Sequence, residues 1–269
     1  MQFRLRMLGS SSEGNCAILQ CGDAALMIDC GFGPEQTERG LAEIGLQWRD
    51  LSGLLLTHLH GDHAHPAALR RLARFGVTLC APAHILSQSR LRGSLGKDTP
   101  VRPLQVNSAS ALASFEITPI PVPHDSPGGC FAYRITGGRG RARRTLGYAT
   151  DIGYPTRGLE EGLVDSDLVV LESNHDILML ERSDRPRSLK TRIRSMGHLS
   201  NHQSSELLSG VLHRSRRQPE AVVLAHLSQE CNRPEIALRA AQGAVRRHAS
   251  RDIALLASPP SSPGVTVSV

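Results

Sequence analysis

The segment 57–63 reads THLHGDH and constrains this chain more than any other feature. It follows the apolar run 53–56 and places His58, His60, Asp62 and His63 within six residues. An apolar run that ends in a polar cluster is typical of a buried strand whose carboxyl end opens into a crevice. Because borderline divalent cations prefer imidazole and carboxylate ligands, the motif predicts a metal site. A His-rich surface loop is the alternative.

Length and composition indicate a globular protein. The 269 residues suffice for one large α/β domain or two small ones. Hydrophobic residues make up 40% and aromatic residues only 3%, so the core must be aliphatic. No linker-like segment interrupts the pattern. We therefore expect a single domain over residues 1–269, in which the Pro- and Ser-rich stretch 258–269 is a weakly structured C-terminal tail.

Hydropathy and cysteine usage predict a cytoplasmic protein with no membrane partner. No window of 18 apolar residues exists, and the alternating residues 1–6 indicate a strand rather than a signal peptide. The six cysteines are scattered, several of them inside strand-like runs, so we expect buried thiols rather than disulfides. The sequence leaves the oligomeric state open.

The positive charge is almost entirely arginine. The net charge is +6, and Lys97 and Lys190 are the only lysines. Arginines cluster in the segments 139–144, 182–194 and 214–217. The planar guanidinium suits bidentate phosphate contacts, which favours a polyanionic partner such as nucleic acid. A general bias toward arginine over lysine explains the composition equally well, so both interpretations stay open.

Histidine or aspartate recurs where further strands are expected to end. His124 stands at a strand end within the strand-like stretch 112–136, which the Pro-rich segment 120–129 interrupts. Asp151 follows the run 146–150, and His226 follows 221–225. Five histidines and two aspartates would fill two metal coordination spheres that share one carboxylate. The candidate ligands are His58, His60, Asp62, His63, His124, Asp151 and His226. The sequence does not separate Zn²⁺ from Mn²⁺.

Further polar residues stand beside these strand ends. Asp29, Glu172 and His175 are expected to orient the ligands through hydrogen bonds. The small-residue segment 9–15 is either a rim that faces phosphate or an ordinary hairpin connection. Ser200 or Asn201 is placed to cap the amphipathic helix that follows, and such helix starts can bind anions.

The whole pattern resembles the metallo-β-lactamase fold, an αββα four-layer sandwich of the α/β class. Within that superfamily, the segments 9–15 (GSSSEGN), 172–176 (ESNHD), 197–201 (GHLSN) and 226–228 (HLS) are similar to the YycJ (WalJ) group of exonucleases. Ribonuclease Z and ribonuclease J are more distant relatives. The short interval between Asp151 and His226 leaves no room for the β-CASP insertion of ribonuclease J.

The resemblance implies specific roles. His58, His60 and His124 would hold one metal ion, Asp62, His63 and His226 the second, and Asp151 would bridge the two. It also implies a metal-dependent 5′-to-3′ DNA exonuclease that uses a hydroxide shared by the two metal ions as its nucleophile, with Asp62 part of the catalytic centre. His198 would bind the scissile phosphate or protonate the leaving oxygen. The alternative for His198 is a helix-start histidine bonded to backbone.

Substrate contacts are assigned to the small-residue segment, the helix start and the arginines before it. The candidates are Ser10, Ser11, Ser12, Asn15, Arg192, Arg194, His198, Ser200 and Asn201. Two other functions compete with the nuclease. A small-molecule metallo-hydrolase acting on a lactone, thioester or cyclic phosphate has the same fold, because fold alone does not set the substrate. A non-catalytic metal-binding module is the third hypothesis.

Overall fold

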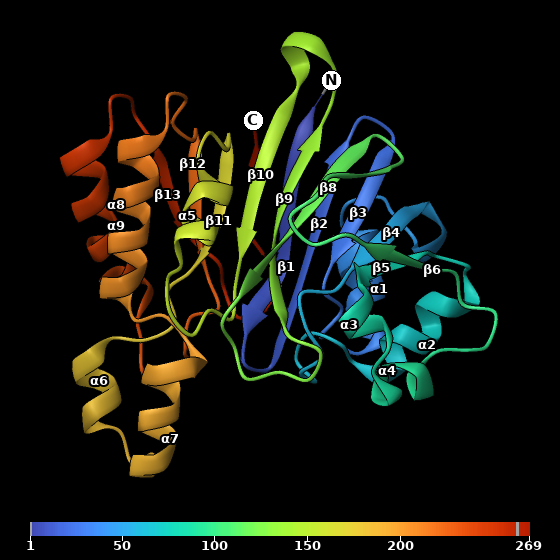
Figure 1. Ribbon diagram of the computed structural model, residues 1–269, viewed down its shortest axis with the longest axis horizontal. Helices are drawn as coiled ribbons and strands as arrows, with labels where there is room; N and C mark the ends of the chain where they lie inside the picture. The colour runs from blue at the N-terminus through green and yellow to red at the C-terminus, as the bar shows by residue number, and fades with distance from the viewer. Residues whose placement is uncertain (1, 262–263) are drawn as a thin grey trace.

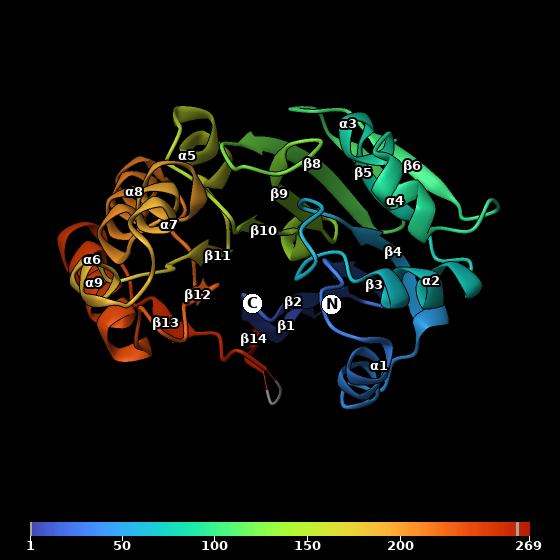
Figure 2. The same ribbon diagram turned by 90° about the horizontal axis from the view of Figure 1, so that it is seen from below.

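Two β-sheets face each other, and helices cover the outer face of each (Figure 1). The computed structural model describes residues 2–261 and 264–269. Seen from below, the layers follow one another as helices, sheet, sheet and helices (Figure 2). The αββα sandwich predicted from the sequence is confirmed.

The first sheet has seven strands in the order β14-β1-β2-β3-β4-β5-β6. It begins as an antiparallel meander and continues as parallel strands, because helices connect the strands from β3 onward. Its strands are β1 (Phe3–Ser11), β2 (Gly14–Cys21), β3 (Ala24–Ile28), β4 (Leu51–Leu55), β5 (Leu79–Pro82), β6 (Val101–Leu104) and β14 (Thr266–Ser268).

The second sheet also has seven strands, in the order β13-β12-β11-β10-β9-β8-β7. Strands β10 to β13 run parallel to one another, and β7 to β10 are antiparallel neighbours. Its strands are β7 (Ser110–Leu112), β8 (Phe115–Val122), β9 (Cys130–Gly137), β10 (Arg144–Ala149), β11 (Leu168–Glu172), β12 (Ala221–Ala225) and β13 (Ala254–Ala257).

The helices follow the strands that they cover. Helices α1 (Pro34–Ala42), α2 (Pro66–Arg74), α3 (Ala83–Leu86) and α4 (Ser89–Ser94) lie on the first sheet's side, and α5 (Arg157–Leu163), α8 (Asn201–Arg214) and α9 (Pro234–His248) cover the second sheet (Figure 1). Helices α6 (Ile177–Arg182) and α7 (Arg187–Arg192) project from the body, and a π-helical turn, Ile193–Gly197, leads back to α8. Short 3₁₀ turns occupy Trp48–Asp50 and Gly140–Ala142.

Apolar side chains of both sheets form the main core between them. Leu5, Ile18 and Leu26 of the first sheet pack in one cluster with Ile135 and Tyr148 of the second. The Tyr133 hydroxyl donates a 2.6 Å hydrogen bond to the carbonyl of Leu56 across the gap, which satisfies a buried polar group. A second cluster joins the outer face of the second sheet to α5, α8 and α9. All six cysteines are buried and unpaired, as predicted.

Local predictions differ from the structure mainly at segment boundaries. The segment 9–15 is largely strand, because Ser10 pairs with Asn15 and Ser11 with Gly14 in the β1–β2 ladder. The segment between β5 and β6 contains two short helices, α3 and α4, instead of one continuous helix. Ser200 is the residue that caps α8, with its side chain accepting from the Gln203 amide.

The C-terminal stretch 258–269 contains ordered pairing. Residues 262 and 263, on which part of the predicted weak structure falls, lie outside the described residues. Strand β14 pairs with β1, and Val267 is buried against the main core. None of the helices among the described residues is both long and apolar enough to cross a bilayer.

The close approach of the β3 exit to the histidine-rich loop generates a first prediction. A Cβ added at Gly31 would lie 1.7 Å from the Asp62 carbonyl oxygen and 2.7 Å from the Asn15 amide nitrogen. Gly31→Ala should therefore lower the free energy of unfolding by about 3 kcal/mol, measured by urea denaturation. Gly33→Ala is the control, because its Cβ would have no neighbour nearer than 3.9 Å. Equal stability of the two variants would contradict this prediction.

Candidate metal centre

The candidate ligands and Asp29 gather because five strands deliver their carboxyl ends to one edge of the sandwich. Asp29 follows β3, the segment 57–63 follows β4, and His124, Asp151 and His226 follow β8, β10 and β12. Asp29, Asp151 and His226 have φ angles of 57°, 57° and 55°. Left-handed backbone is unfavourable for residues with a Cβ, so surrounding contacts must hold these three turns in place.

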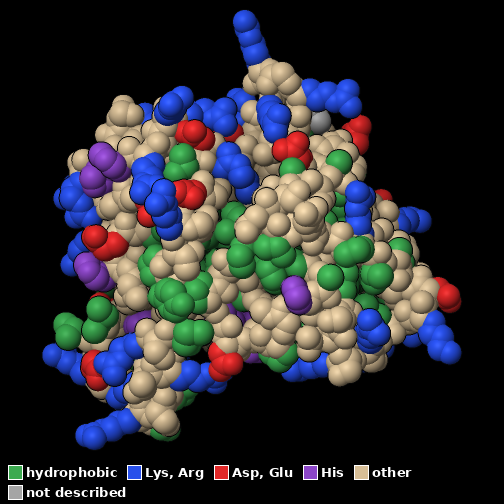
Figure 3. Space-filling model, viewed as in Figure 1, with side chains coloured by type: hydrophobic (Ala, Val, Ile, Leu, Met, Phe, Trp, Pro, Cys, Tyr) green, Lys and Arg blue, Asp and Glu red, His purple; other side chains and the backbone are tan. Residues whose placement is uncertain are grey.

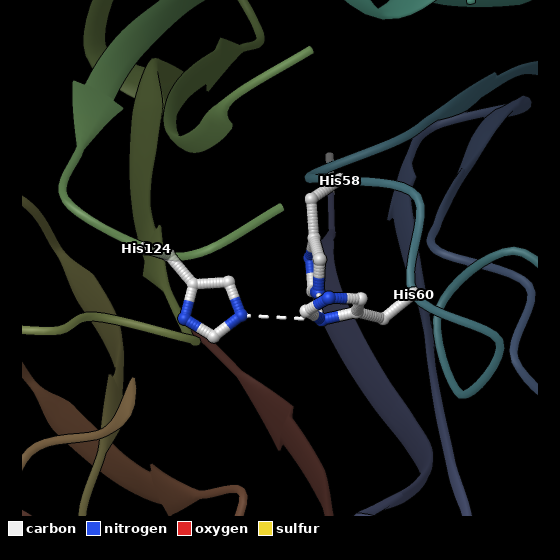
Figure 4. Close-up of side chains that lie close together, drawn as sticks. All are labelled: His58, His60 and His124. Carbon is white, nitrogen blue, oxygen red and sulfur yellow. Dashed lines mark hydrogen bonds between the residues drawn. The ribbon is translucent and has the colours of Figure 1, made fainter. Parts of the chain in front are cut away.

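Three histidines form the first ligand group. Nε2 of His58 lies 3.0 Å from Nδ1 of His60, and Nε2 of His124 lies 3.2 Å from the same atom (Figure 4). Ring nitrogens of all three lie within 4.8 Å of one another. Imidazole nitrogens converging at this separation can share one cation in place of the ring-to-ring contacts.

Hydrogen bonds on the far sides of two rings fix their orientation. Nδ1 of His124 donates to the Gly197 carbonyl at 2.8 Å, and Nδ1 of His58 lies 3.0 Å from the Thr57 hydroxyl. Each bond holds a proton on Nδ1, which leaves the Nε2 lone pair for the centre of the group.

Asp62, His63 and His226 form the second group. Oδ2 of Asp62 lies 3.6 Å from Nε2 of His63 and 3.8 Å from Nε2 of His226. Asp151 lies between the two groups, since its carboxylate is 3.1 Å from Nε2 of His63 and 3.9 Å from Nε2 of His124. The structure thus brings all seven residues predicted from the sequence into one cluster.

Two buried atoms in this cluster lack hydrogen bonds. Within the described chain, Oδ2 of Asp151 and Nε2 of His226 are shielded from solvent and have no hydrogen-bond partner. An unsatisfied buried carboxylate oxygen or ring nitrogen is costly, and a bound cation would satisfy both. Together with the imidazole and carboxylate donor set, these atoms fit divalent metal ions.

Asp29 makes the orienting contacts expected of it. Its buried carboxylate accepts from Nδ1 of His63 at 2.8 Å and from the amide and hydroxyl of Thr57, each at 2.8 Å. His63 is therefore held with its Nε2 toward the cluster, as carboxylate–histidine pairs arrange metal ligands.

The Glu172 carboxylate accepts hydrogen bonds from four groups of the site. Its Oε2 accepts from the amides of Ile152 and Leu199, and its Oε1 accepts from Nδ1 of His198 at 2.9 Å and Nδ1 of His226 at 3.0 Å. Although burial opposes the charge, the bonds and charges of His198 and His226 lower the pKa of Glu172 to about 2. The carboxylate remains ionised at neutral pH and keeps Nε2 of His226 available.

The pKa values of the other groups follow their neighbours. Burial and the nearby charge of His63 lower the pKa of His58 well below its usual value, so this ring is neutral at pH 7. Burial alone would raise the pKa of Asp151, but His226 and His63 hold it well below its usual range. Despite burial, Asp151 raises the pKa of His63 and of His226, the latter to about 10. Metal binding must displace the protons of these two rings.

A cleft of about 260 Å³ opens over the cluster. Of the residues predicted to bind substrate, Ser12, Arg192 and His198 line it. Arg185, Leu189, Asn174 and Ser228 also line it and were not among the predicted substrate residues. Arg185, Asn174 and Ser228 lie in segments that the sequence had singled out, but the sequence did not show which of their side chains reach the cleft.

The remaining predicted substrate residues lie elsewhere. Ser10, Ser11, Asn15, Ser200 and Asn201 are buried behind the cluster. Ser10 accepts from the His226 amide and donates to the side chain of Asn15, whose Nδ2 lies 2.9 Å from Nε2 of His63, so these residues contact the candidate ligands from behind instead of facing the cleft. Arg194 pairs with Glu181 and is not part of the cleft lining.

His175 is buried as well, but its side chain does not orient a candidate ligand. Its Nδ1 has no hydrogen-bond partner in the described part of the chain, and burial lowers its pKa to about 4. The residue contributes through its backbone, which bridges to Ser200 at the start of α8.

The position of Asp151 between the two groups gives a second prediction. Asp151→Ala removes the shared negative charge, so metal content measured by elemental analysis should fall below that of the unaltered protein. Hydrolytic activity should fall by two or more orders of magnitude, roughly the loss expected for a metal-assisted reaction. Asp98→Ala, at an exposed carboxylate, is the control. Full metal content in Asp151→Ala would refute the bridging role.

Known proteins share both sequence and fold with this chain. Residues 25–227 match the family model described as a beta-lactamase superfamily domain. The chain is 29% identical over 239 residues to the exodeoxyribonuclease WalJ of Streptococcus pneumoniae serotype 2, covering 87% of this chain and 85% of that protein. It is 28% identical over 240 residues to the exodeoxyribonuclease YycJ of Bacillus anthracis, covering 88% and 87%.

A solved structure supports the same grouping. The metallo-beta-lactamase fold protein YhfI from Bacillus subtilis superposes with a TM-score of 0.71 at 19% sequence identity, and the match covers 100% of both chains. The family model spans most of the sequence, and the cluster of histidines and aspartates lies at the carboxyl ends of the strands. This chain belongs to the metallo-β-lactamase superfamily of hydrolases.

Proposed function

We propose that this protein is a phosphodiesterase that uses two divalent metal ions, Zn²⁺ or Mn²⁺, to remove nucleotides from DNA in the 5′-to-3′ direction. The observation that carries the proposal is the placement of the seven-residue cluster at the floor of a cleft whose wall includes Arg185 and Arg192. Similarity to two exodeoxyribonucleases over most of the chain supports DNA as the substrate.

His58, His60 and His124 would hold one metal ion and Asp62, His63 and His226 the other, with Asp151 shared. When bound, the metals supply Lewis-acid stabilisation of phosphate charge and lower the pKa of water toward neutrality. Asp62 is the most exposed carboxylate of the cluster, with 22% of its side chain accessible. It therefore lies on the side of the proposed metal centre that faces the substrate.

His198 is the residue proposed to act on the phosphate. Its Nδ1 bonds to the ionised Glu172, and its ring lines the cleft with its centroid 5.5 Å from that of His124. Because Glu172 holds a proton on Nδ1, Nε2 is the nitrogen available to donate a hydrogen bond or a proton to a phosphate oxygen. The hydrogen bond to a carboxylate, instead of to backbone, favours this role over a capping one.

The size of the cleft favours a substrate that enters by its end. A volume of about 260 Å³ lies at the lower limit of ligand sites, so one nucleotide could occupy it but a duplex could not. The same size favours one second candidate, hydrolysis of a small phosphodiester such as a cyclic phosphate. Arg192, paired with Asp125 at the mouth, is positioned to meet the phosphates that continue beyond the cleft.

The His198 assignment gives a third prediction. His198→Ala should retain the metal content of the unaltered protein and lower turnover on end-labelled DNA by about 100-fold, in the range attributed to general acid catalysis. His202→Ala, an exposed histidine of α8, should leave turnover unchanged. If His198→Ala instead lowers stability and leaves turnover intact, the residue is structural.

Salt dependence separates DNA from a small substrate and gives a fourth prediction. The KM for duplex DNA should rise steeply with salt, because each neutralised duplex phosphate contributes about 0.9 to the slope of log affinity against log salt. Arg192→Gln should reduce that slope by about one contact, whereas Arg246→Gln, at an exposed arginine of α9, should not. Flat salt dependence, with efficient hydrolysis of a cyclic phosphate, lactone or thioester and no cleavage of DNA, would favour the second candidate.

A further inference from the structure

The outer face of the second sheet changes character along its strands. Near the metal cluster, Ile120, Ala132 and Ala149 point to the helices and join the apolar cluster with α5 and α8. Farther along the same strands, Thr136 pairs in register with both Glu116 and Thr145. A sheet face covered by helices is normally apolar, so this polar end requires another explanation.

Beyond α5 the polar end of the face is hollow. Arginine side chains surround a cavity of about 480 Å³. We call it the arginine hollow, and its lining residues are Glu116, Thr118, Arg134, Thr136, Gly140, Arg141, Arg143, Thr145 and Arg217. Basic side chains lie at the top of the molecule, where the turn between β9 and β10 is found (Figure 3).

Positive charge exceeds negative charge in the arginine hollow. Arg217 pairs with Asp167 at 3.2 Å, and Arg143 with Glu116 at 3.2 Å. Arg134 donates to the carbonyls of Gly162 and Val164 and to the Ser166 hydroxyl, none of which carries a charge. Arg141 has no ion-pair partner among residues 2–261 and 264–269. Two of the four guanidinium groups, those of Arg134 and Arg141, therefore form no ion pair with a carboxylate of the described residues.

The crowding of cations affects the most buried arginine. Burial is the main cause that lowers the pKa of Arg134, and the nearby charges of Arg217 and Arg143 lower it further, although Asp165 and Asp167 act in the opposite direction. An anion in the arginine hollow would stabilise the charged guanidinium. The hydroxyl of Thr118 would add a hydrogen-bond donor. Thr136 and Thr145 share one hydrogen bond of 3.1 Å between their hydroxyls, which leaves one donor of that pair for a ligand.

We propose that the arginine hollow is an anion-binding site for phosphate groups, separate from the metal cluster. Planar guanidinium forks with adjacent hydroxyls match phosphate oxygens bidentately. Strand β9 has its Cys130 end at the cluster, where Cys130 contacts the Asp151 carbonyl, and its Gly137 end at the arginine hollow. Its eight residues place the two sites about 20 Å apart. The proposal stands whether or not the enzyme acts on DNA.

The phosphate could belong to a free anion or to a nucleic-acid backbone. Two probes separate these sources, inorganic phosphate and a phosphorothioate oligodeoxythymidylate that resists hydrolysis. Each is titrated into the full-length protein while amide NMR shifts are followed at Thr136, Gly140 and Thr145 for the arginine hollow and at 58–63 for the metal cluster. We expect saturable shifts at the first set that are independent of those at the second.

The test variant is Arg141→Gln combined with Arg143→Gln, on exposed side chains of the turn. It should weaken binding at Thr136, Gly140 and Thr145 about tenfold, the loss of one or two charge-assisted hydrogen bonds, without changing the shifts at 58–63. Arg246→Gln with Arg247→Gln removes equal charge from α9 and should leave binding unchanged. Arg141→Gln alone, at a side chain without an ion pair in the described chain, should weaken binding without affecting the fold.

The outcomes are distinct. Saturation by inorganic phosphate assigns a free anion to the arginine hollow, and saturation by the oligonucleotide alone assigns a nucleic-acid backbone. Shifts confined to 58–63, or equal losses in the test and control variants, would overturn the proposal. Failure of DNA hydrolysis would leave these shifts unaffected, so the two proposals fail separately.

Discussion

Three carboxylates are buried where the two sheets meet, and the surrounding structure must compensate their charge. Asp29, Asp151 and Glu172 have at most 1% of their surface exposed. An uncompensated buried charge would cost several kcal/mol, on the order of a large part of the net stability of a domain. Donors from separate elements meet this requirement for two of them: Thr57 and His63 bond to Asp29, and four groups converge on Glu172. Asp151 has the rings of His63 and His226 beside it instead. The hydrogen bonds to these carboxylates therefore fix the positions of the strand ends. The histidines at those strand ends are positioned as a result.

Gathering the candidate ligands at strand ends also requires strained backbone. His226 is held in a left-handed conformation while its amide donates to the Ser10 hydroxyl and its carbonyl accepts from the Asn174 side chain. Asn232 in turn donates to the carbonyls of Ser173 and Asn174. These buried hydrogen bonds hold the strained turn rigid, which suits a residue that must keep its direction toward the cluster. This is a physical reason for polar residues such as Ser10 to lie behind the metal centre.

The sequence allowed the strands and the ligand cluster to be predicted because both depend on local pattern. Apolar runs ending in His or Asp marked β4, β10 and β12, and the residues after them meet in space because parallel strands end at one edge. The wall of the cleft could not be predicted in this way. Helices α6 and α7 have six residues each, too short for a helical period to be recognised. The sequence also did not show where the side chains of Ser10 and Arg194 point, because burial and ion pairs depend on tertiary contacts.

Different kinds of interaction hold the two sides of the cleft in place. The metal side is fixed by buried hydrogen bonds, whereas α6 and α7 rest on a small apolar cluster of Leu180, Ile193 and Cys231. Two exposed ion pairs also attach this helical hairpin, formed by α6 and α7, to the rest of the protein. They join Arg192 to Asp125 and Arg185 to Glu230. Such pairs contribute only about 0–1 kcal/mol and are screened by salt, so the hairpin opens at a lower free energy than the sheets. Under the proposed function, a rigid cluster of candidate ligands beneath a more weakly held wall would let one ligand geometry accept substrates that enter by their ends.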